Sequence, residues 1–113
     1  YNQLFKDSAM TPFVQLPPEV FPRHVYNQYV IGVGNRRDEL RGFLNENRIG
    51  CEIYYPVPLH LQDCFKSLGY KSGDFPESEK AAGQTLALPI SHEVSREQQE
   101  YIVNTIQRFF LGE

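Results

Sequence analysis

The chain reads Tyr54-Tyr55-Pro56-Val57-Pro58-Leu59-His60-Leu61-Gln62 directly after an apolar segment that is typical of a strand. Each proline fixes φ near about −65° and biases the residue before it toward extended geometry, so Tyr55 and Val57 are held extended. His60 then stands at a defined place at the end of a rigid loop. Such a loop suits the recognition of a ligand, but a stiff strand exit with a capping histidine explains the same residues equally well.

Upstream of this proline loop, the pattern predicts a strand, a helix and a second strand. Residues 25–33 are rich in β-branched and aromatic side chains, as strands are. Asn35 is expected to cap a helix with one apolar face. That face consists of Leu40, Phe43 and Leu44. Gly50 stands where a helix-ending residue with positive φ is wanted, and residues 51–55 predict the second strand.

Downstream of the loop, the pattern predicts a helical turn over residues 63–68 and a helix over residues 76–85 that begins at Pro76. Gly83 costs about 1 kcal/mol relative to alanine inside that helix, so we expect close packing there. Residues 86–88 form a short apolar run that predicts a third strand.

A last helix begins at Ser95, which forms a capping box with Gln98. Its apolar face consists of Ile102, Val103, Ile106, Phe109 and Phe110. The sum is an α/β (α+β) domain of two layers, in which a small, mainly antiparallel sheet is covered by helices on one face.

The order of these motifs resembles the C-terminal small domain of the pyridoxal-phosphate (PLP)-dependent sugar aminotransferases, the DegT/DnrJ/StrS family. The resemblance covers about residues 1–110 and rests on His24–Ile31, Arg37–Leu40, Ile49-Gly50, the proline loop, Gly69-Tyr70, Asp74–Pro76, Glu79 and Leu86–Ile90. It implies the fold of the small domain of fold-type I aminotransferases. Residues 1–23 would then be the end of an interdomain helix and a Pro-rich connector, and residues 24–113 the small C-terminal domain.

Composition excludes several classes of partner. The 113 residues suit one domain, and their net charge of −3 without a run of lysine or arginine argues against nucleic acid. No apolar stretch reaches the roughly 20 residues that span a bilayer, so we expect no membrane contact and a cytoplasmic location. Two cysteines are too few for a disulfide framework, and we expect reduced thiols.

The four lysines, Lys6, Lys66, Lys71 and Lys80, all stand among polar residues. A Schiff-base lysine needs a desolvated pocket that lowers its pKa, so none of the four suits that role. In the resembled family, this lysine and the main cofactor ligands belong to the large N-terminal domain. We therefore expect PLP in the full-length enzyme, no cofactor bound to this chain alone and no catalytic residue in it. A first residue other than Met is taken to indicate an excised or processed domain.

The resemblance also implies that the proline loop forms a wall of the active site, with His60 and Tyr55 facing the cofactor and the sugar nucleotide. An imidazole and a phenol suit the recognition of sugar hydroxyls or phosphate oxygens. The alternative is that His60 bonds a backbone carbonyl and Tyr55 lies in the core. His24 is interpreted as structural.

Two further constellations are weaker. Cys51, His60 and Cys64 are one ligand short of a closed zinc site, and free core cysteines are the preferred interpretation, with no metal expected. Arg36 and Arg37 beside a helix N-terminus could hold a phosphate, although a solvated helix start is the commoner explanation.

Two hypotheses of function follow. In the first, the chain is the C-terminal domain of an enzyme that transfers an amino group, typically from glutamate, to a keto sugar nucleotide in polysaccharide or antibiotic sugar biosynthesis. It would be inactive alone, would need the missing PLP-binding domain and would belong to a homodimer. In the second, it is a free-standing binding or oligomerisation module derived from such a domain.

Overall fold

The computed structural model describes residues 1–8, 10–20 and 22–112. Its elements run α1 (Asn2–Asp7), β1 (Tyr29–Gly32), α2 (Arg37–Glu46), α3 (Pro76–Gln84), β2 (Thr85–Leu88) and α4 (Arg96–Leu111). Single 3-10 turns lie at Gly34–Arg36, Leu59–Leu61 and Asp63–Leu68. Among the described residues, no helix combines the length and the apolar character needed to cross a membrane.

The sheet is antiparallel and small, as predicted. β1 pairs with β2, with Tyr29 opposite Leu88 and Ile31 opposite Leu86. The ladder ends at the Tyr29–Leu88 pair, and residues 25–28 lie outside it. The first strand is therefore shorter than the predicted range of 25–33.

Single-residue bridges extend the sheet on both sides. Gln15, from the connector, exchanges two hydrogen bonds with Gly32 at the edge of β1. Glu52 does the same with Ala87 at the edge of β2, at 2.8 and 3.1 Å. The predicted second strand over residues 51–55 is thus reduced to the bridge at Glu52, because the chain then leaves the sheet.

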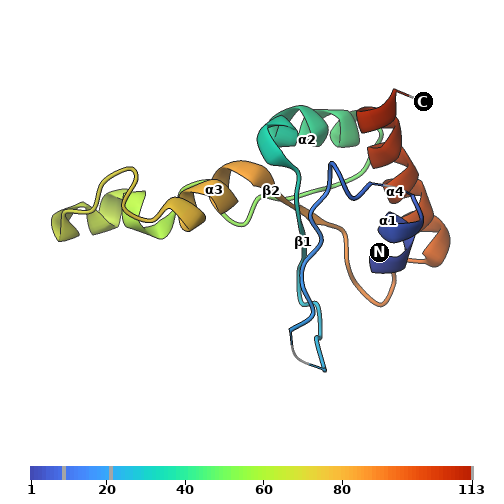
Figure 1. The fold of residues 1–113 in the computed structure, drawn as a ribbon, viewed down its shortest axis with the longest axis horizontal. Coiled ribbons are helices and arrows are strands. Elements are labelled where there is room, and N and C mark those ends of the chain that lie inside the picture. Colours follow the sequence, from blue (N-terminus) through green and yellow to red (C-terminus); the bar gives the residue numbers. More distant parts are fainter. Residues whose placement is uncertain (9, 21, 113) are drawn as a thin grey trace.

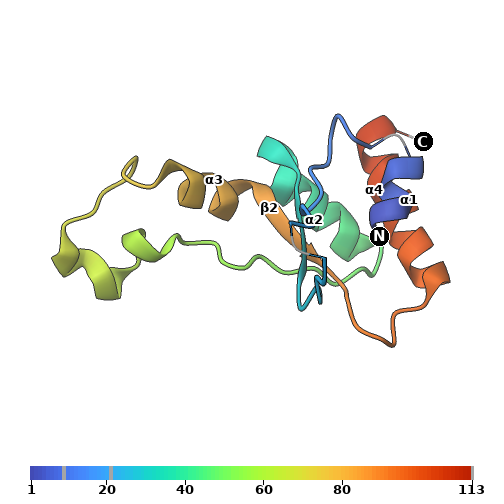
Figure 2. The ribbon, with the colours of Figure 1, turned by 60° about the horizontal axis from the view of Figure 1, so that its bottom comes forward.

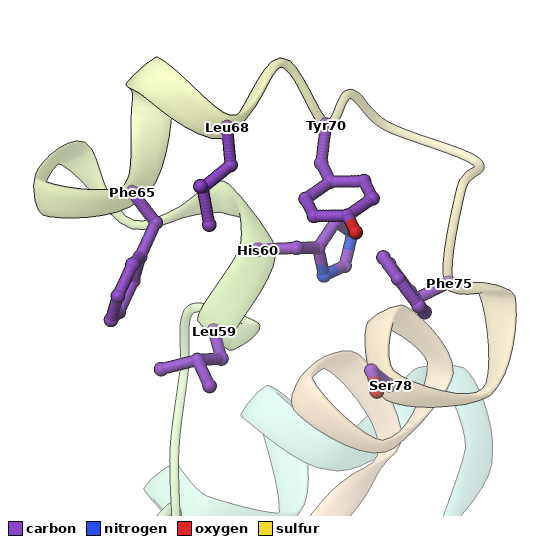
Figure 3. Close-up of a pocket in the computed structure, with 7 residues that line it drawn as sticks. All are labelled: Leu59, His60, Phe65, Leu68, Tyr70, Phe75 and Ser78. Atoms are coloured by element: carbon purple, nitrogen blue, oxygen red, sulfur yellow. The ribbon is translucent and has the colours of Figure 1, made fainter.

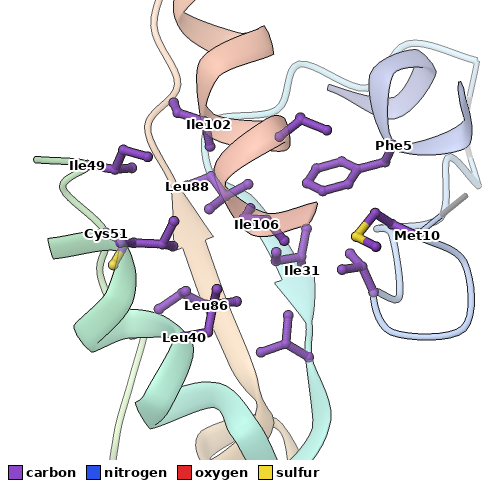
Figure 4. Packing of buried hydrophobic residues seen from close by; sticks show 14 of the residues in the cluster. Phe5, Met10, Ile31, Leu40, Ile49, Cys51, Leu86, Leu88, Ile102 and Ile106 are labelled. Atoms are coloured by element: carbon purple, nitrogen blue, oxygen red, sulfur yellow. The ribbon is translucent and has the colours of Figure 1, made fainter. Parts of the chain in front are cut away.

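Helices cover one face of this sheet, which confirms the two-layer α+β prediction (Figure 4). α2 and α4 pack on the face that carries Ile31 and Leu86, and α1 packs against α4. The fully buried aliphatic side chains of this core are Ile31, Leu40, Leu44, Leu86 and Ile106. Phe5 and Met10 extend the core toward the N-terminus.

The boundaries of α2 differ from the prediction at both ends. Asn35 does not cap the helix, because its side-chain oxygen accepts a hydrogen bond from the side-chain amide of Gln84. A 3-10 turn leads into Arg37. Gly50 does not end the helix either. The side-chain amide of Asn47 donates to the carbonyl of Phe43, and Arg48 adopts the positive φ, so the turn is complete before Gly50 is reached.

The other predicted helices are confirmed. Ser95 and Gln98 form the capping box of α4, with hydrogen bonds of 3.1 and 2.9 Å. α3 begins at Pro76, and residues 63–68 form a 3-10 turn. The close packing expected at Gly83 is not found, since a Cβ there would meet open space.

Residues 54–75, here called the arm, project from the end of the sheet and return through α3 (Figures 1 and 2). They account for the elongated shape, which measures 48 × 34 × 25 Å. The radius of gyration of 15.5 Å exceeds the value of about 13 Å for a compact domain of this length. The proline loop therefore leads away from the core.

Candidate functional site

The arm carries an open hollow on its surface (Figure 3). It has a volume of about 310 Å³ and is lined by Leu59, His60, Phe65, Leu68, Tyr70, Phe75 and Ser78. Its apolar side chains are all exposed to solvent. A cluster of exposed apolar side chains on a projecting segment is typical of a surface that meets a ligand or another part of a protein.

His60 is the polar residue at the centre of this hollow. Pro58 is extended, and its carbonyl accepts from the backbone N–H of Leu61 to close the short turn that carries His60. His60 is only 9% exposed, and its ring lies 4.8 Å from that of Phe75. We call residues 54–62 the outgoing limb of the arm and residues 69–75 its returning limb. The loop thus turns the imidazole inward, between the two limbs.

The buried nitrogen of His60 faces one acidic group. Its Nε2 lies 3.4 Å from Oε2 of Glu79, although the geometry falls short of a hydrogen bond. In the described part of the chain, Nε2 has no hydrogen-bond partner. A buried polar atom without a hydrogen-bond partner costs about 1–3 kcal/mol, so a hydrogen bond between Nε2 and Oε2 would stabilise the arm.

Glu79 is itself held by the turn before α3. The amide of Gly73 donates to both carboxylate oxygens at 2.9 Å, and the hydroxyl of Ser72 donates to Oε1 at 3.0 Å. The Gly73 hydrogen bonds lower the pKa of the Glu79 carboxyl, with smaller contributions from Ser72, Phe75 and His60. Glu79 is therefore a carboxylate at neutral pH.

Tyr55 lies apart from His60. It is 68% exposed and does not line the hollow; it borders a second depression with Pro56, Val57 and Gln62. The alternative that placed Tyr55 in the core is wrong. The alternative for His60 is not found either, since no hydrogen bond from its ring to a carbonyl occurs among the described residues.

Of the remaining candidates, the structure separates the cysteines. Cys51 is buried, and burial raises the pKa of its thiol, whereas Cys64 is exposed on the arm. The prediction of two core cysteines is wrong for Cys64, because the arm lies outside the core. No group of three or more metal-binding side chains gathers within the described ranges.

His24 lies in a local turn, where its Nδ1 accepts a hydrogen bond from the backbone amide of Tyr26.

Arg37 has a structural role that the sequence did not suggest. It is buried, and its guanidinium donates to the carbonyls of Ala82 and Thr85 at the end of α3, at 2.8 and 3.1 Å. Arg36 pairs with Glu39 and lies over the ring of Phe109. Both arginines are thus engaged within the chain. The preferred interpretation, a solvated helix start, is wrong for the buried Arg37, and the alternative of a phosphate site is not assembled either.

The lysines are all exposed, as predicted. A Schiff-base lysine needs burial to lower its pKa, so the residues present do not fit the covalent attachment of PLP.

Comparisons with known proteins find similarity to one family along most of the chain. The model of the DegT/DnrJ/EryC1/StrS aminotransferase family matches residues 1–107. A pleiotropic regulatory protein of Geobacillus stearothermophilus is 48% identical over 97% of this chain and 29% of its own length. The dTDP-3-amino-3,6-dideoxy-alpha-D-galactopyranose transaminase of Aneurinibacillus thermoaerophilus is 32% identical over 93% of this chain and 28% of its own.

The fold is shared with solved structures as well. DesV of S. venezuelae, crystallised in complex with a ketimine intermediate, superimposes with a TM-score of 0.87 at 28% identity. The match covers 96% of this chain and 29% of that one. The chain thus spans less than a third of the length of these relatives. With 107 residues matched by one family model, this chain belongs to the DegT/DnrJ/EryC1/StrS aminotransferase family.

Proposed function

We propose that this chain is the C-terminal domain of a PLP-dependent sugar aminotransferase, which transfers an amino group from an amino acid, typically glutamate, to a keto sugar nucleotide. The observation that carries the proposal is the family match over residues 1–107. The similarity to a dTDP-sugar transaminase supports the substrate class. The domain has no residue suited to hold PLP covalently, so catalysis belongs to the longer protein and the chain alone is inactive.

In this proposal the arm contributes a wall of the substrate cleft. His60 and Tyr55 contact the sugar nucleotide, and the apolar residues around His60 lie against the missing PLP-binding domain. Their exposure in this chain supports that arrangement, because a surface of this kind is normally covered. The working enzyme is a cytoplasmic homodimer.

The test is steady-state kinetics of the longer protein with PLP, glutamate and a keto sugar nucleotide. We expect His60→Ala to raise KM for the sugar nucleotide about tenfold, which corresponds to the loss of one good polar contact. His24→Ala is the matched control, because His24 only supports a local turn. An unchanged KM in His60→Ala would remove His60 from the substrate site, and failure of the wild-type protein to transaminate any keto sugar nucleotide would reject the function itself.

A free-standing binding or oligomerisation module is the second candidate. It is favoured by the name of the Geobacillus relative, which describes a regulatory protein and not a transaminase. The two candidates separate in one sedimentation experiment combined with the assay above. A module would self-associate with increasing concentration and lack activity in every length of the protein, whereas the domain of an enzyme gains activity when the rest of the protein is present.

A further inference from the structure

Glu79 lies on α3, directly after the arm, and it contacts both limbs of the arm. From the outgoing limb it receives His60, at 3.4 Å between Nε2 and Oε2. From the returning limb it accepts three hydrogen bonds, from the amide of Gly73 and the hydroxyl of Ser72. One side chain thus connects the histidine to the turn that precedes α3.

We propose that Glu79 is a positioning residue, which fixes the tautomer and the orientation of His60 so that Nδ1 is the nitrogen offered to a ligand. A carboxylate only accepts hydrogen bonds. Facing Nε2, it therefore favours the tautomer in which Nε2 carries the proton. In a neutral imidazole the other nitrogen, Nδ1, is then an acceptor, so His60 would receive a hydrogen bond from a hydroxyl of the sugar nucleotide.

The carboxylate can perform this role because its own position is fixed. The side chain is 20% exposed, and both oxygens are occupied by the Gly73 amide. α3 supplies the backbone anchor, since the amide of Glu79 donates to the carbonyl of Phe75. A group held from three sides can orient a neighbour at little further cost in side-chain entropy.

The same arrangement fixes the walls of the hollow. The ring centroid of Phe75 lies 4.8 Å from that of His60 and 5.0 Å from that of Tyr70. The three rings therefore pack together beside the turn that Glu79 stabilises. Figure 3 shows His60 between the Leu68 and Phe75 side chains, with Tyr70 beside it. We call the contacts of the Glu79 carboxylate with Ser72, Gly73 and His60 the Glu79 clamp. Their loss is expected to increase the mobility of the imidazole and of its aromatic neighbours together.

This inference rests on the proposed function only where it names the ligand, because the tautomer can be measured without one. The first experiment is nitrogen NMR of the histidine rings in the whole protein, with His60 assigned by the loss of its signals in His60→Gln. We expect Nε2 to be the protonated nitrogen. In Glu79→Gln we expect loss of this single-tautomer pattern, since the glutamine amide can donate to the ring as well as accept from it. Glu77→Gln, on an exposed residue of the same helix, should leave the pattern unchanged.

The second experiment compares KM and kcat for the sugar nucleotide. We expect Glu79→Gln to raise KM about tenfold, as His60→Ala does, with little change in kcat, and the double variant to be no worse than either single one. Ser72→Ala, which removes one support of the carboxylate and keeps its charge, should give a smaller rise. It replaces Glu79→Gln as the decisive variant if that protein fails to fold.

The outcomes separate the two ideas. Protonation of Nδ1 in the wild type, or ring signals unchanged in Glu79→Gln, overturns the positioning role whatever the kinetics show. A normal KM in His60→Ala together with a fixed Nε2–H tautomer rejects the substrate contact but retains Glu79 as the residue that orients the ring. Additive effects in the double variant would also overturn the proposal, because Glu79 would then act independently of His60.

Discussion

At the scale of single residues, Arg37 makes the clearest energetic prediction. Its guanidinium satisfies two carbonyls at the end of α3 from a buried position, so Arg37→Ala leaves both without a partner. We expect the free energy of unfolding to fall by about 3 kcal/mol, measured by urea denaturation. Arg96→Ala, which removes an exposed pair with Glu100, should cost about 0.5 kcal/mol or less. Equal losses in the two variants would contradict the role of Arg37.

Residue roles were harder to predict than residue positions. The sequence placed His60 on a short turn after the prolines, which is correct, but its buried ring lies against Glu79, nineteen positions away. Arg37 suggested an anion site because it stands at a helix start, and only the fold brings the end of α3 against it. Tyr55 is exposed and separate from His60, since two side chains on the same limb of a loop need not face the same way. These are tertiary contacts, and local patterns do not encode them.

At the scale of elements, the arm should respond to acid through Glu79. Its pKa is lowered in the folded chain, chiefly by the Gly73 amide, below the ordinary value of 4.5. The stabilising contribution is thus fully present above pH 4.5 and is lost as the pH falls through the folded-state pKa. We expect the Gly73 amide resonance to shift below pH 4.5 and its protection against hydrogen exchange, relative to the intrinsic rate at each pH, to fall. Glu79→Gln should abolish this pH dependence, and Glu77→Gln should retain it; a response centred above pH 4.5 would point to another group.

Elements with a chemical start signal were predicted well, and elements without one were not. Pro76 and the Ser95–Gln98 capping box located α3 and α4, because these residues satisfy or tolerate unpaired N–H groups at a helix start. The first two strands were predicted too long, whereas the third, predicted over residues 86–88, is found as β2. The ends of strands depend on which partner backbone lies alongside, and the pairing of β1 with β2 ends at Tyr29 and Leu88. β-propensity in residues 25–28 could not reveal that.

At the scale of the whole molecule, the chain divides into a packed core and an arm that lies outside it (Figure 1). The core joins the sheet to α1, α2 and α4 through fully buried side chains, whereas the arm is held by two short 3-10 turns and the Glu79 clamp. Regions with few buried apolar contacts open at a lower free energy than the core. The arm is therefore the part of this chain whose stability depends most on whatever lies against it.

Limited trypsin digestion tests this division. Lys66 has a side chain 76% exposed and stands on the arm with Lys71, while Arg41 lies on α2 against the core. We expect cuts after Lys66 and Lys71 in the 113-residue chain to precede the cut after Arg41, which requires global unfolding. In the longer enzyme proposed above, the arm cuts should slow at least about tenfold, because an arm covered by another domain must detach before it can be cleaved. Replacing both lysines by glutamine should remove the early fragments and leave cleavage at Arg41 unchanged. Equal rates at Lys66 in the two lengths of protein would mean that the arm stays uncovered, and its apolar hollow would then be a site for a separate partner.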